Sequence, residues 1–497
     1  MDNGYDAGAH QIGAVKGKLM NVLDSEALIK AQRDVQVPFV VQGKLDDGRI
    51  VDMEFIKLLR LLPGKRIVGL ARCEGKQLLV KAFLGRHAKR YAAKERSGMS
   101  HITSAGVRSP KFYWQGTFIS GHGQALAMEY LEDAESLQDR WNSAREDDER
   151  VDVLTRAMII IAKLHNHGVV QTDIHLANFL MSQGRIYTID GGGITRKSEP
   201  PLEEKASLEN LSWFFAQFFP RYDELVQVVL PAYDAVRGWV ADPARVIDLH
   251  CEIVTSRDSR KRSYLDKAFR DCTRFKCEAT FDRFLVCERS AYDQPMQDLL
   301  KDPDALIEGG EILKNGNSAT VARVQIDGHS LVIKRYNIKG PGHALSRAFR
   351  KSRAWTSWAN AFHMEFLGIP SLKPLAMLEH RFGPLRGKAY FITEYIEGPD
   401  ALAFLRDSKQ TNGEPEALAN LLQNLSSSKI SHGDLKATNF LMGSDGPVII
   451  DLDAMRQHKD PEQFQKAFNK DLDRFMKNWE DQPELASRFE GLLKFPE

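Results

Sequence analysis

The stretch His432-Gly433-Asp434-Leu435-Lys436-Ala437-Thr438-Asn439-Phe440-Leu441 decides the predicted fold. In it an aspartate stands five positions before an asparagine, and the β-type run Val448-Ile449-Ile450-Asp451 follows. A second copy, Asp173-Ile174-His175-Leu176-Ala177-Asn178-Phe179-Leu180-Met181, leads to Tyr187-Thr188-Ile189-Asp190. In both copies the second aspartate follows the first by 17 positions, from 173 to 190 and from 434 to 451. Two copies with the same spacing are improbable by chance, so the sequence predicts a duplicated domain.

Two carboxylates and an amide in this order suit phosphoryl transfer from ATP. The first carboxylate, Asp173 or Asp434, would orient the acceptor hydroxyl, while the amide and the second carboxylate would hold Mg²⁺ on the phosphates. The candidate magnesium ligands are Asn178, Asp190, Asn439 and Asp451. One Asp-x4-Asn alone is weak evidence, so the prediction depends on both copies.

Each half also carries a lysine inside an apolar, strand-like run, Lys81 in the first and Lys334 in the second. A lysine on a buried strand is costly unless its ammonium meets an anion, such as the phosphates of a nucleotide. The alternative is an edge-strand lysine that faces water. A helix is predicted over 86–105, and its Glu95 is the candidate partner of Lys81, with a solvated glutamate as the alternative.

The second half differs from the first in two features. The turn Asn315-Gly316-Asn317 could lay backbone amides over phosphates, although many hairpins contain such residues. Ser357 stands where the first half has Glu95, so the helix offers Lys334 no acid. We therefore expect both halves to retain a capacity for metal and nucleotide, with the first half as the stronger catalyst.

Both halves resemble the lipopolysaccharide core kinases, the Kdo- and heptose-kinase group of Gram-negative bacteria. Besides the strand lysine and the His-Gly-Asp loop, the resemblance rests on the break Gly368-Ile369-Pro370 and on Lys470-Asp471-Leu472-Asp473-Arg474-Phe475. It runs from about residue 55 to 490 and is weakest across 200–297, where the pattern favours helices. One departure is Gln171-Thr172 in place of His-Gly. The first loop is also similar to that of aminoglycoside phosphotransferases.

The resemblance implies an α+β protein with two tandem bilobal protein-kinase-like domains, each a small antiparallel β lobe plus a helical lobe. The expected first domain spans 1–298, with an N-terminal β extension and a C-terminal helical region. The second, smaller domain is expected over 299–497. ATP would sit between the lobes of each domain, with Lys81 or Lys334 on its phosphates.

Two further residues gain roles from the resemblance. Lys436, two positions after Asp434, would neutralise the transferring phosphoryl group, and His175 occupies that place in the first copy. Asp453 is either a second metal ligand or a surface carboxylate.

Composition narrows the remaining classes. The net charge is +1, which gives no field that would steer the chain to nucleic acid. No apolar run of about 18 residues predicts a membrane-spanning helix, and the first residues lack the pattern of a signal peptide, so we expect a cytoplasmic protein. Cys272, Cys277 and Cys287 cluster without a zinc-binding spacing and are interpreted as reduced structural thiols.

The resemblance implies a lipopolysaccharide core sugar or glycolipid as the acceptor, and hence peripheral contact with the cytoplasmic face of the inner membrane. Basic residues at 260–262 and 347–353 could meet anionic lipid, or could be a solvated face. Two alternatives stay open. One is a kinase of the same fold that acts on a protein or another small molecule. The other is a partly inactive, nucleotide-binding scaffold in envelope assembly.

Overall fold

The computed structural model describes residues 21–337, 350–407 and 413–493. By their contacts these residues form two compact units. Unit 1 comprises the chain up to Phe214 together with Leu225–Leu249, and unit 2 comprises Phe215–Glu224 together with the chain from His250. Both units combine antiparallel sheet with helices, so the α+β class is confirmed.

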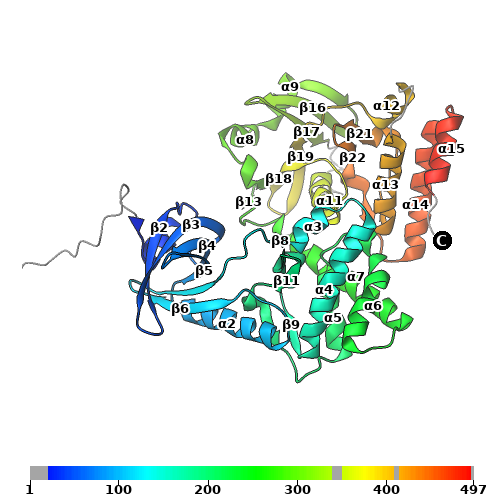
Figure 1. Cartoon of the computed structure of the whole chain (residues 1–497). Helices are drawn as coiled ribbons and strands as arrows, with labels where there is room; N and C mark the ends of the chain where they lie inside the picture. Colours follow the sequence, from blue (N-terminus) through cyan, green and yellow to red (C-terminus); the bar gives the residue numbers. More distant parts are fainter. Residues whose placement is uncertain (1–20, 338–349, 408–412, 494–497) are drawn as a thin grey trace, which may run out of the picture. The chain divides into compact units, whose positions relative to one another are not determined.

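The β part of unit 1 is a closed sheet, with strand order β1-β2-β3-β4-β5-β7-β6 and a further pairing of β2 with β6 (Figure 1). Its strands are β1 (Asn21–Val22), β2 (Phe39–Leu45), β3 (Ile50–Leu62), β4 (Arg66–Cys73), β5 (Lys76–Leu84), β6 (Phe112–Phe118) and β7 (Gly123–Glu129). Closure pairs both long edges of the sheet, and apolar side chains such as Phe39, Phe55 and Val80 fill its interior. The short helix α1 (Ser25–Ala31) contributes Leu28 to this core. Helix α2 (Ala88–Ser104) follows β5.

The helical part of unit 1 is organised around α4 (Asp147–Asn166). Glu146 and Glu149 form a capping box at its start, and buried apolar residues recur every three or four positions along it. The other helices are α3 (Leu137–Ser143), α5 (Glu204–Phe215) and α6 (Leu225–Arg237), with the 3₁₀ turns η1 (Leu176–Asn178) and η2 (Gly191–Gly193). The short strands are β8 (Glu135–Ser136), β9 (Val169–Gln171), β10 (Phe179–Ser182), β11 (Arg185–Thr188) and β12 (Ile194–Arg196). The unit boundary falls within α7 (Pro243–Lys267).

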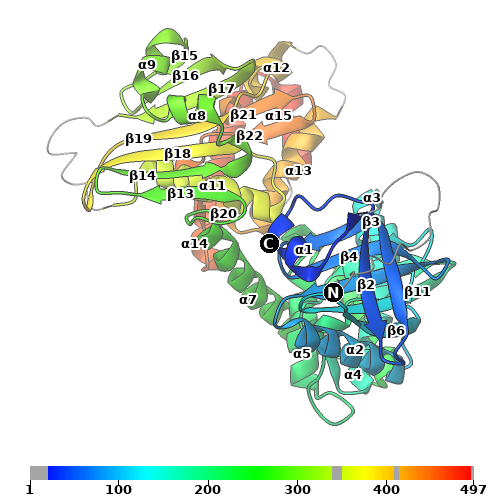
Figure 2. The same ribbon diagram turned by 90° about the vertical axis from the view of Figure 1, so that its left-hand side faces the viewer.

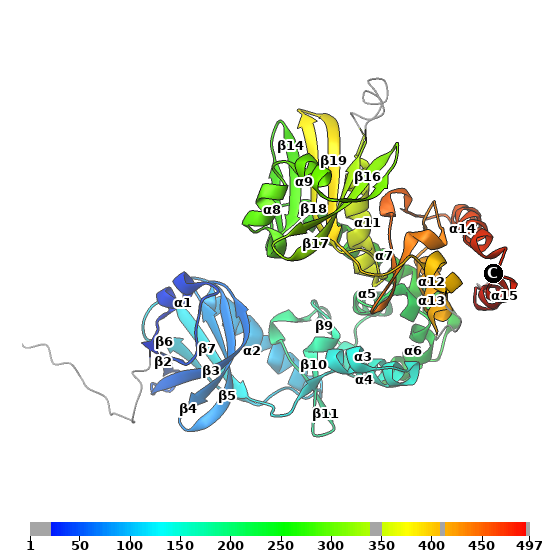
Figure 3. The same cartoon turned by 90° about the horizontal axis from the view of Figure 1, so that it is seen from above.

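Unit 2 contains an open seven-stranded antiparallel sheet in the order β13-β14-β18-β19-β17-β16-β15 (Figure 2). Its strands are β13 (Phe275–Ala279), β14 (Arg283–Glu288), β15 (Glu311–Asn315), β16 (Ala319–Ile326), β17 (His329–Tyr336), β18 (Pro374–Phe382) and β19 (Leu385–Glu394). One face packs on α8 (Gln294–Leu299) and α9 (Pro303–Gly309) through a cluster that includes Met296 and Ile333. The other face packs on α11 (Arg353–Leu367), which begins at the cap Ser352 (Figure 3).

The helical part of unit 2 continues the apolar cluster of α11. Its helices are α12 (Ala401–Asp407), α13 (Glu414–Ser427), α14 (Pro461–Met476) and α15 (Pro483–Leu492), with the 3₁₀ turns η3 (Pro220–Tyr222), η4 (Arg289–Ala291), η5 (Ala437–Asn439), η6 (Leu452–Ala454) and η7 (Lys477–Trp479). The short strands are β20 (Ile430–Ser431), β21 (Phe440–Gly443), β22 (Gly446–Ile449) and β23 (Arg456–Gln457). Trp358, Phe475 and Trp479 are fully buried in this cluster.

The segment 200–297 departs from the sequence-based expectation in two ways. The helical interpretation is wrong for β13 and β14, which form a hairpin that pairs with β18. Because of this pairing, residues 250–298 belong to unit 2, whereas the predicted boundary followed residue 298. Of the basic residues at 347–353, those at 347–349 lie outside the described residues, and Arg353 begins α11.

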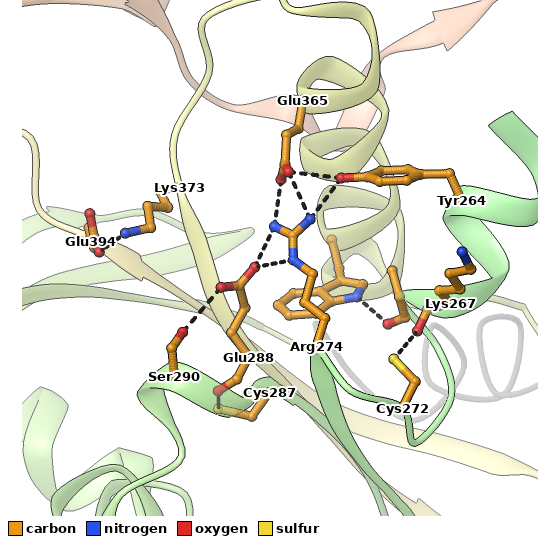
Figure 4. A network of polar contacts seen from close by, with 12 residues as sticks. Tyr264, Lys267, Cys272, Arg274, Cys287, Glu288, Ser290, Glu365, Lys373 and Glu394 are labelled. Atoms are coloured by element: carbon orange, nitrogen blue, oxygen red, sulfur yellow. Dashed lines mark hydrogen bonds and ion pairs between the residues drawn. The ribbon is translucent and has the colours of Figure 1, made fainter. Parts of the chain in front are cut away.

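A polar network binds the hairpin to α11 (Figure 4). The Arg274 guanidinium donates to Glu288 of β14 at 2.7 Å and to Glu365 of α11 at 2.8 Å. Tyr264 of α7 donates to the same Glu365 carboxylate at 2.8 Å. The charge of Arg274 is thus paired within unit 2.

Candidate active site

Unit 2 contains a cavity of about 450 Å³ beneath its sheet. Apolar side chains of β16, β17 and β19, including Val321, Val332 and Phe391, form one wall. Leu441 and Ile450 lie on the opposite wall, and the segment Glu394–Ile396 closes the side. Lys334, Asn439 and Asp451 line the polar end. An apolar slot with cations and carboxylates at one end has the shape and chemistry that a nucleotide requires.

Lys334 meets two carboxylates in this cavity. Its Nζ lies 2.5 Å from Asp451 Oδ1 and 3.7 Å from Asp453 Oδ2. Arg353, at the start of α11, forms an ion pair with the same Asp453. The strand lysine is therefore held by acids of the loop after β22, while the helix position Ser357 offers it no acid, as the sequence indicated.

Asp453 of the loop serves as an acidic partner of Lys334, a role that Ser357 of the helix cannot fill. Ser357 is buried and hydrogen-bonds with Tyr336 Oη at 2.7 Å, away from the lysine. The Asp453 side chain is only 8 % exposed, which excludes the interpretation as a surface carboxylate. Burial alone would raise the pKa of Asp451, but the charge and hydrogen bond of Lys334, together with the charges of His432 and Lys314, outweigh burial and lower it. Burial alone would lower the pKa of Lys334. The neighbours of Lys334, Asp451 and Asp453 among them, outweigh burial and raise this pKa.

The loop that carries Asp434 is braced by α14. The buried Asp471 carboxylate accepts hydrogen bonds from the backbone amides of His432 at 2.7 Å and Gly433 at 3.0 Å. His432 in turn hydrogen-bonds through Nε2 to the Ile450 carbonyl, 3.1 Å away. Burial lowers the pKa of His432, which keeps its imidazole neutral for this role. These contacts join the loop to the strand that delivers Asp451.

Two contacts and one backbone conformation set the geometry of the loop that carries Asp434. Lys436 Nζ lies 2.9 Å from Asp434 Oδ1. Asn439 donates from Nδ2 to the Asp434 carbonyl at 2.7 Å, which leaves its amide oxygen available as a metal ligand. Asp451 adopts a left-handed backbone at φ 61°, which turns its carboxylate into the cavity that Asn439 also lines. One carboxylate and one amide fit Mg²⁺, which binds few protein groups and completes its shell with phosphates and water.

Unit 1 contains a cavity of about 280 Å³ in the corresponding place. Val68 and Leu79 line its β side, Leu180 and Ile189 line its helical side, and Glu129–Leu131 lie at its edge. Lys81 forms a buried ion pair with Glu95, as predicted from the sequence. Its Nζ also lies 3.8 Å from Asp190 Oδ1. The Asn178 Nδ2 donates to the Asp173 carbonyl at 2.8 Å, matching the contact of Asn439.

Glu95 holds the loop after Asp190 as well as the lysine. Its two oxygens accept from the amides of Gly191 and Gly192, each at 3.0 Å. A Cβ at Gly191 would lie 2.2 Å from the Glu95 carbonyl oxygen, and one at Gly98 would lie 1.9 Å from the Gly191 oxygen. Gly98 and Gly191 therefore allow α2 to approach this loop closely.

The catalytic loop of unit 1 lacks the bracing seen in unit 2. Gln171 replaces the histidine, and neither polar atom of its buried side-chain amide has a hydrogen-bond partner. Asn210 of α5 occupies the place of Asp471, at the same offset of 261 residues that separates Asp173 from Asp434. Its Nδ2 donates to the Gln171 carbonyl at 3.0 Å, and its Oδ1 lies 3.0 Å from the ring Nε2 of His165, so it contacts no loop amide as Asp471 does. The Asp173 side chain is 78 % exposed, against 43 % for Asp434.

Two groups of predicted residues lie away from the cavities. Asn315, Gly316 and Asn317 do not line the cavity of unit 2, and Lys314 and Ser318 from the same hairpin do. The thiols of Cys272, Cys277 and Cys287 are free. Burial raises the pKa of Cys287 to about 12, which makes it unreactive. No cluster of three or more metal-binding side chains occurs in 21–337, 350–407 or 413–493.

Sequence reasoning missed Arg66, Arg353 and the brace from Asp471. The signal for the brace was present, because Asp471-Leu472 and Asn210-Leu211 share the offset of the two loops. The sequence held no comparable signal for the arginines. Arg66 begins the strand β4 of unit 1, and Arg353 begins the helix α11 of unit 2.

Unit 2 gathers a strand lysine, two loop carboxylates and an amide around one cavity, a set of groups that suits phosphoryl transfer. Residues 306–489 match the lipopolysaccharide kinase (Kdo/WaaP) family, which confirms the resemblance for this part of the chain and supports a kinase. The match begins in α9 and ends in α15, so it covers the lysine strand, the catalytic loop and the bracing helix of unit 2. A search of curated proteins found no match.

Proposed function

We propose that the protein is an ATP-dependent kinase that phosphorylates a sugar hydroxyl of the lipopolysaccharide core, with the chemistry in unit 2. The observation that carries the proposal is the braced loop of unit 2, in which Asp471 holds the backbone before Asp434 and Lys436 pairs with it. The family match over 306–489 supports the acceptor class.

In this mechanism Lys334 would hold phosphate oxygens of ATP, and Asn439 and Asp451 would hold Mg²⁺, which would neutralise charge on the phosphates. Asp434 orients the sugar hydroxyl for in-line attack. Lys436 stabilises negative charge on the transferring group. The tandem arrangement also belongs to this proposal, in which unit 1 is a second kinase-like domain with Lys81, Glu95 and Asp190 in the same order.

No helix in the described part of the chain is long and apolar enough to cross a bilayer. We therefore propose that the protein meets its glycolipid acceptor as a peripheral protein on the cytoplasmic face of the inner membrane.

Transfer of radiolabelled phosphate from ATP to purified core oligosaccharide tests the proposal. We expect labelled oligosaccharide with the purified full-length chain and ATP–Mg²⁺, and unlabelled oligosaccharide without the chain. Label on a co-purifying protein, with none on the oligosaccharide, would favour a protein kinase. Bound nucleotide without ADP release would favour a scaffold.

A further inference from the structure

Unit 1 places an unusual positive charge at the polar end of its cavity. Arg66 lies at the start of β4 and lines the cavity beside Val68 and Lys81. Its Nη1 lies 3.7 Å from Asp190 Oδ1, and its buried Nε has no hydrogen-bond partner. Arg60, on the preceding strand, lines the same cavity. A buried guanidinium N–H without a partner costs free energy, and a ligand oxygen in the cavity would remove that cost.

Asp190 consequently faces two cations, Arg66 at 3.7 Å and Lys81 at 3.8 Å. A divalent metal bound to this carboxylate would meet the repulsion of both charges. In unit 2 the arginine from α11 pairs with Asp453 instead, so Asp451 has Lys334 as its cationic partner. The residues of unit 1 therefore fit a polyphosphate better than they fit a metal ion.

We infer that unit 1 is a second nucleotide site that binds a nucleoside triphosphate without a divalent metal and without transferring its phosphate. Arg66 and Lys81 hold the phosphates, with Arg66 supplying the charge that Mg²⁺ supplies in unit 2. The apolar walls at Val68, Leu79 and Leu180 receive the base. The unsupported Gln171 and the exposed Asp173 leave the bound nucleotide unreacted.

This inference stands apart from the proposed function, because binding in unit 1 does not depend on which acceptor unit 2 uses. The test therefore measures binding and uses no transfer assay.

Hydrogen exchange of the full-length wild-type chain with ATP in excess EDTA is the first measurement. We expect ATP to protect amides of β4 and β5 in unit 1, and to leave β16 and β17 of unit 2 unchanged. Adding Mg²⁺ should extend protection to unit 2. Protection confined to unit 2, or protection of unit 1 that appears only with Mg²⁺, would overturn the inference.

Calorimetric titration of ATP in EDTA is the second measurement. The full-length chain should bind one ATP, and Arg66→Gln should weaken binding about tenfold or more, because a charge-assisted contact is lost. Arg66→Lys should recover part of the affinity. Arg72→Gln is the matched control, since Arg72 lies on the same strand with its guanidinium on Glu54 at 2.8 Å. Equal affinities for Arg66→Gln and Arg72→Gln would contradict the role of Arg66.

Discussion

In both units an acidic side chain holds the strand lysine, but the acid comes from a helix in unit 1 and from a loop in unit 2. In unit 1 the acid is Glu95 of α2, which pairs with Lys81 and accepts a hydrogen bond from the backbone amide of Gly192. In unit 2 the acid is Asp453 of the loop, and Ser357 of α11 packs against Tyr336. Asp453 lies 261 positions after Gly192, which is the offset between the two loops. The acid therefore stands on the helix in unit 1 and on the loop in unit 2. The presence of the helix acid therefore does not reveal which unit is better organised for catalysis.

The catalytic loops differ more than the lysine contacts. Unit 2 has a buried carboxylate, Asp471, on two loop amides, whereas unit 1 has Asn210 on one carbonyl. Preorganised groups contribute most to transition-state stabilisation, so the loop outweighs the lysine partner. The geometry favours unit 2 as the catalyst, opposite to the expectation from the sequence.

Removing the loop brace should have a large effect on turnover. Asp471→Asn exchanges a charged acceptor of two amide hydrogen bonds for a neutral one, and hydrogen bonds to charged groups contribute about 1.5–3 kcal/mol. We expect kcat to fall about tenfold to a hundredfold with little change in ATP binding, measured by steady-state kinetics. Asn210→Asp, the reverse substitution at the equivalent position of unit 1, should leave kcat unchanged. A fall in kcat for Asn210→Asp would show that unit 1 contributes to the chemistry.

The exchanged acid gives a smaller prediction. Asp453→Asn removes one of the two carboxylates near Lys334 and the partner of Arg353. We expect KM for ATP to rise about tenfold, because the cations that meet the phosphates lose their fixed positions. Asp473→Asn, an exposed aspartate on α14, is the control. A normal KM for Asp453→Asn would mean that Asp451 alone positions Lys334.

The hairpin network predicts a change in stability. Arg274→Met leaves the carboxylates of Glu288 and Glu365 without their shared guanidinium. Because Arg274 is 40 % exposed, solvent compensates in part, and we expect a loss of about 1 kcal/mol in the free energy of unfolding of unit 2. Chemical denaturation followed by tryptophan fluorescence measures it, with the exposed Lys301→Met as control. Equal stability of the two variants would show that apolar packing alone holds α11.

The smallest prediction concerns pH. The pKa of Asp451 is lowered by Lys334, so this pair stabilises the fold above about pH 4 and the contribution is lost as the pH falls through the lowered pKa. The pKa of Lys334 is raised, so its contribution is complete below about pH 10 and is lost only above it. The difference in Tm between wild type and Lys334→Met should therefore be constant from about pH 5 to 9 and shrink in acid. A difference that grows below pH 4 would contradict the pair.

The sequence predicted the pairing of Lys81 with Glu95. Lys81, Glu95, Asp173 and Asn178 lie in the expected order along unit 1, because their spacings are set by short local elements. The hairpin of β13 and β14 escaped prediction, since its pairing with β18 joins residues about 90 positions apart. Asp453 was ambiguous for a similar reason. Whether a carboxylate after a strand meets solvent or a lysine depends on packing between elements, which no local pattern records.

Paired substitution of the two loop aspartates tests the central claim most directly. Asp434→Ala and Asp173→Ala are made separately in the full-length chain, and phosphate transfer from ATP to core oligosaccharide is measured for each. Loss of a catalytic-loop aspartate should cost about 10² or more in rate where that unit does the chemistry. The account predicts that Asp434→Ala abolishes transfer and that Asp173→Ala leaves it intact. Loss of transfer with Asp173→Ala and normal transfer with Asp434→Ala would contradict it.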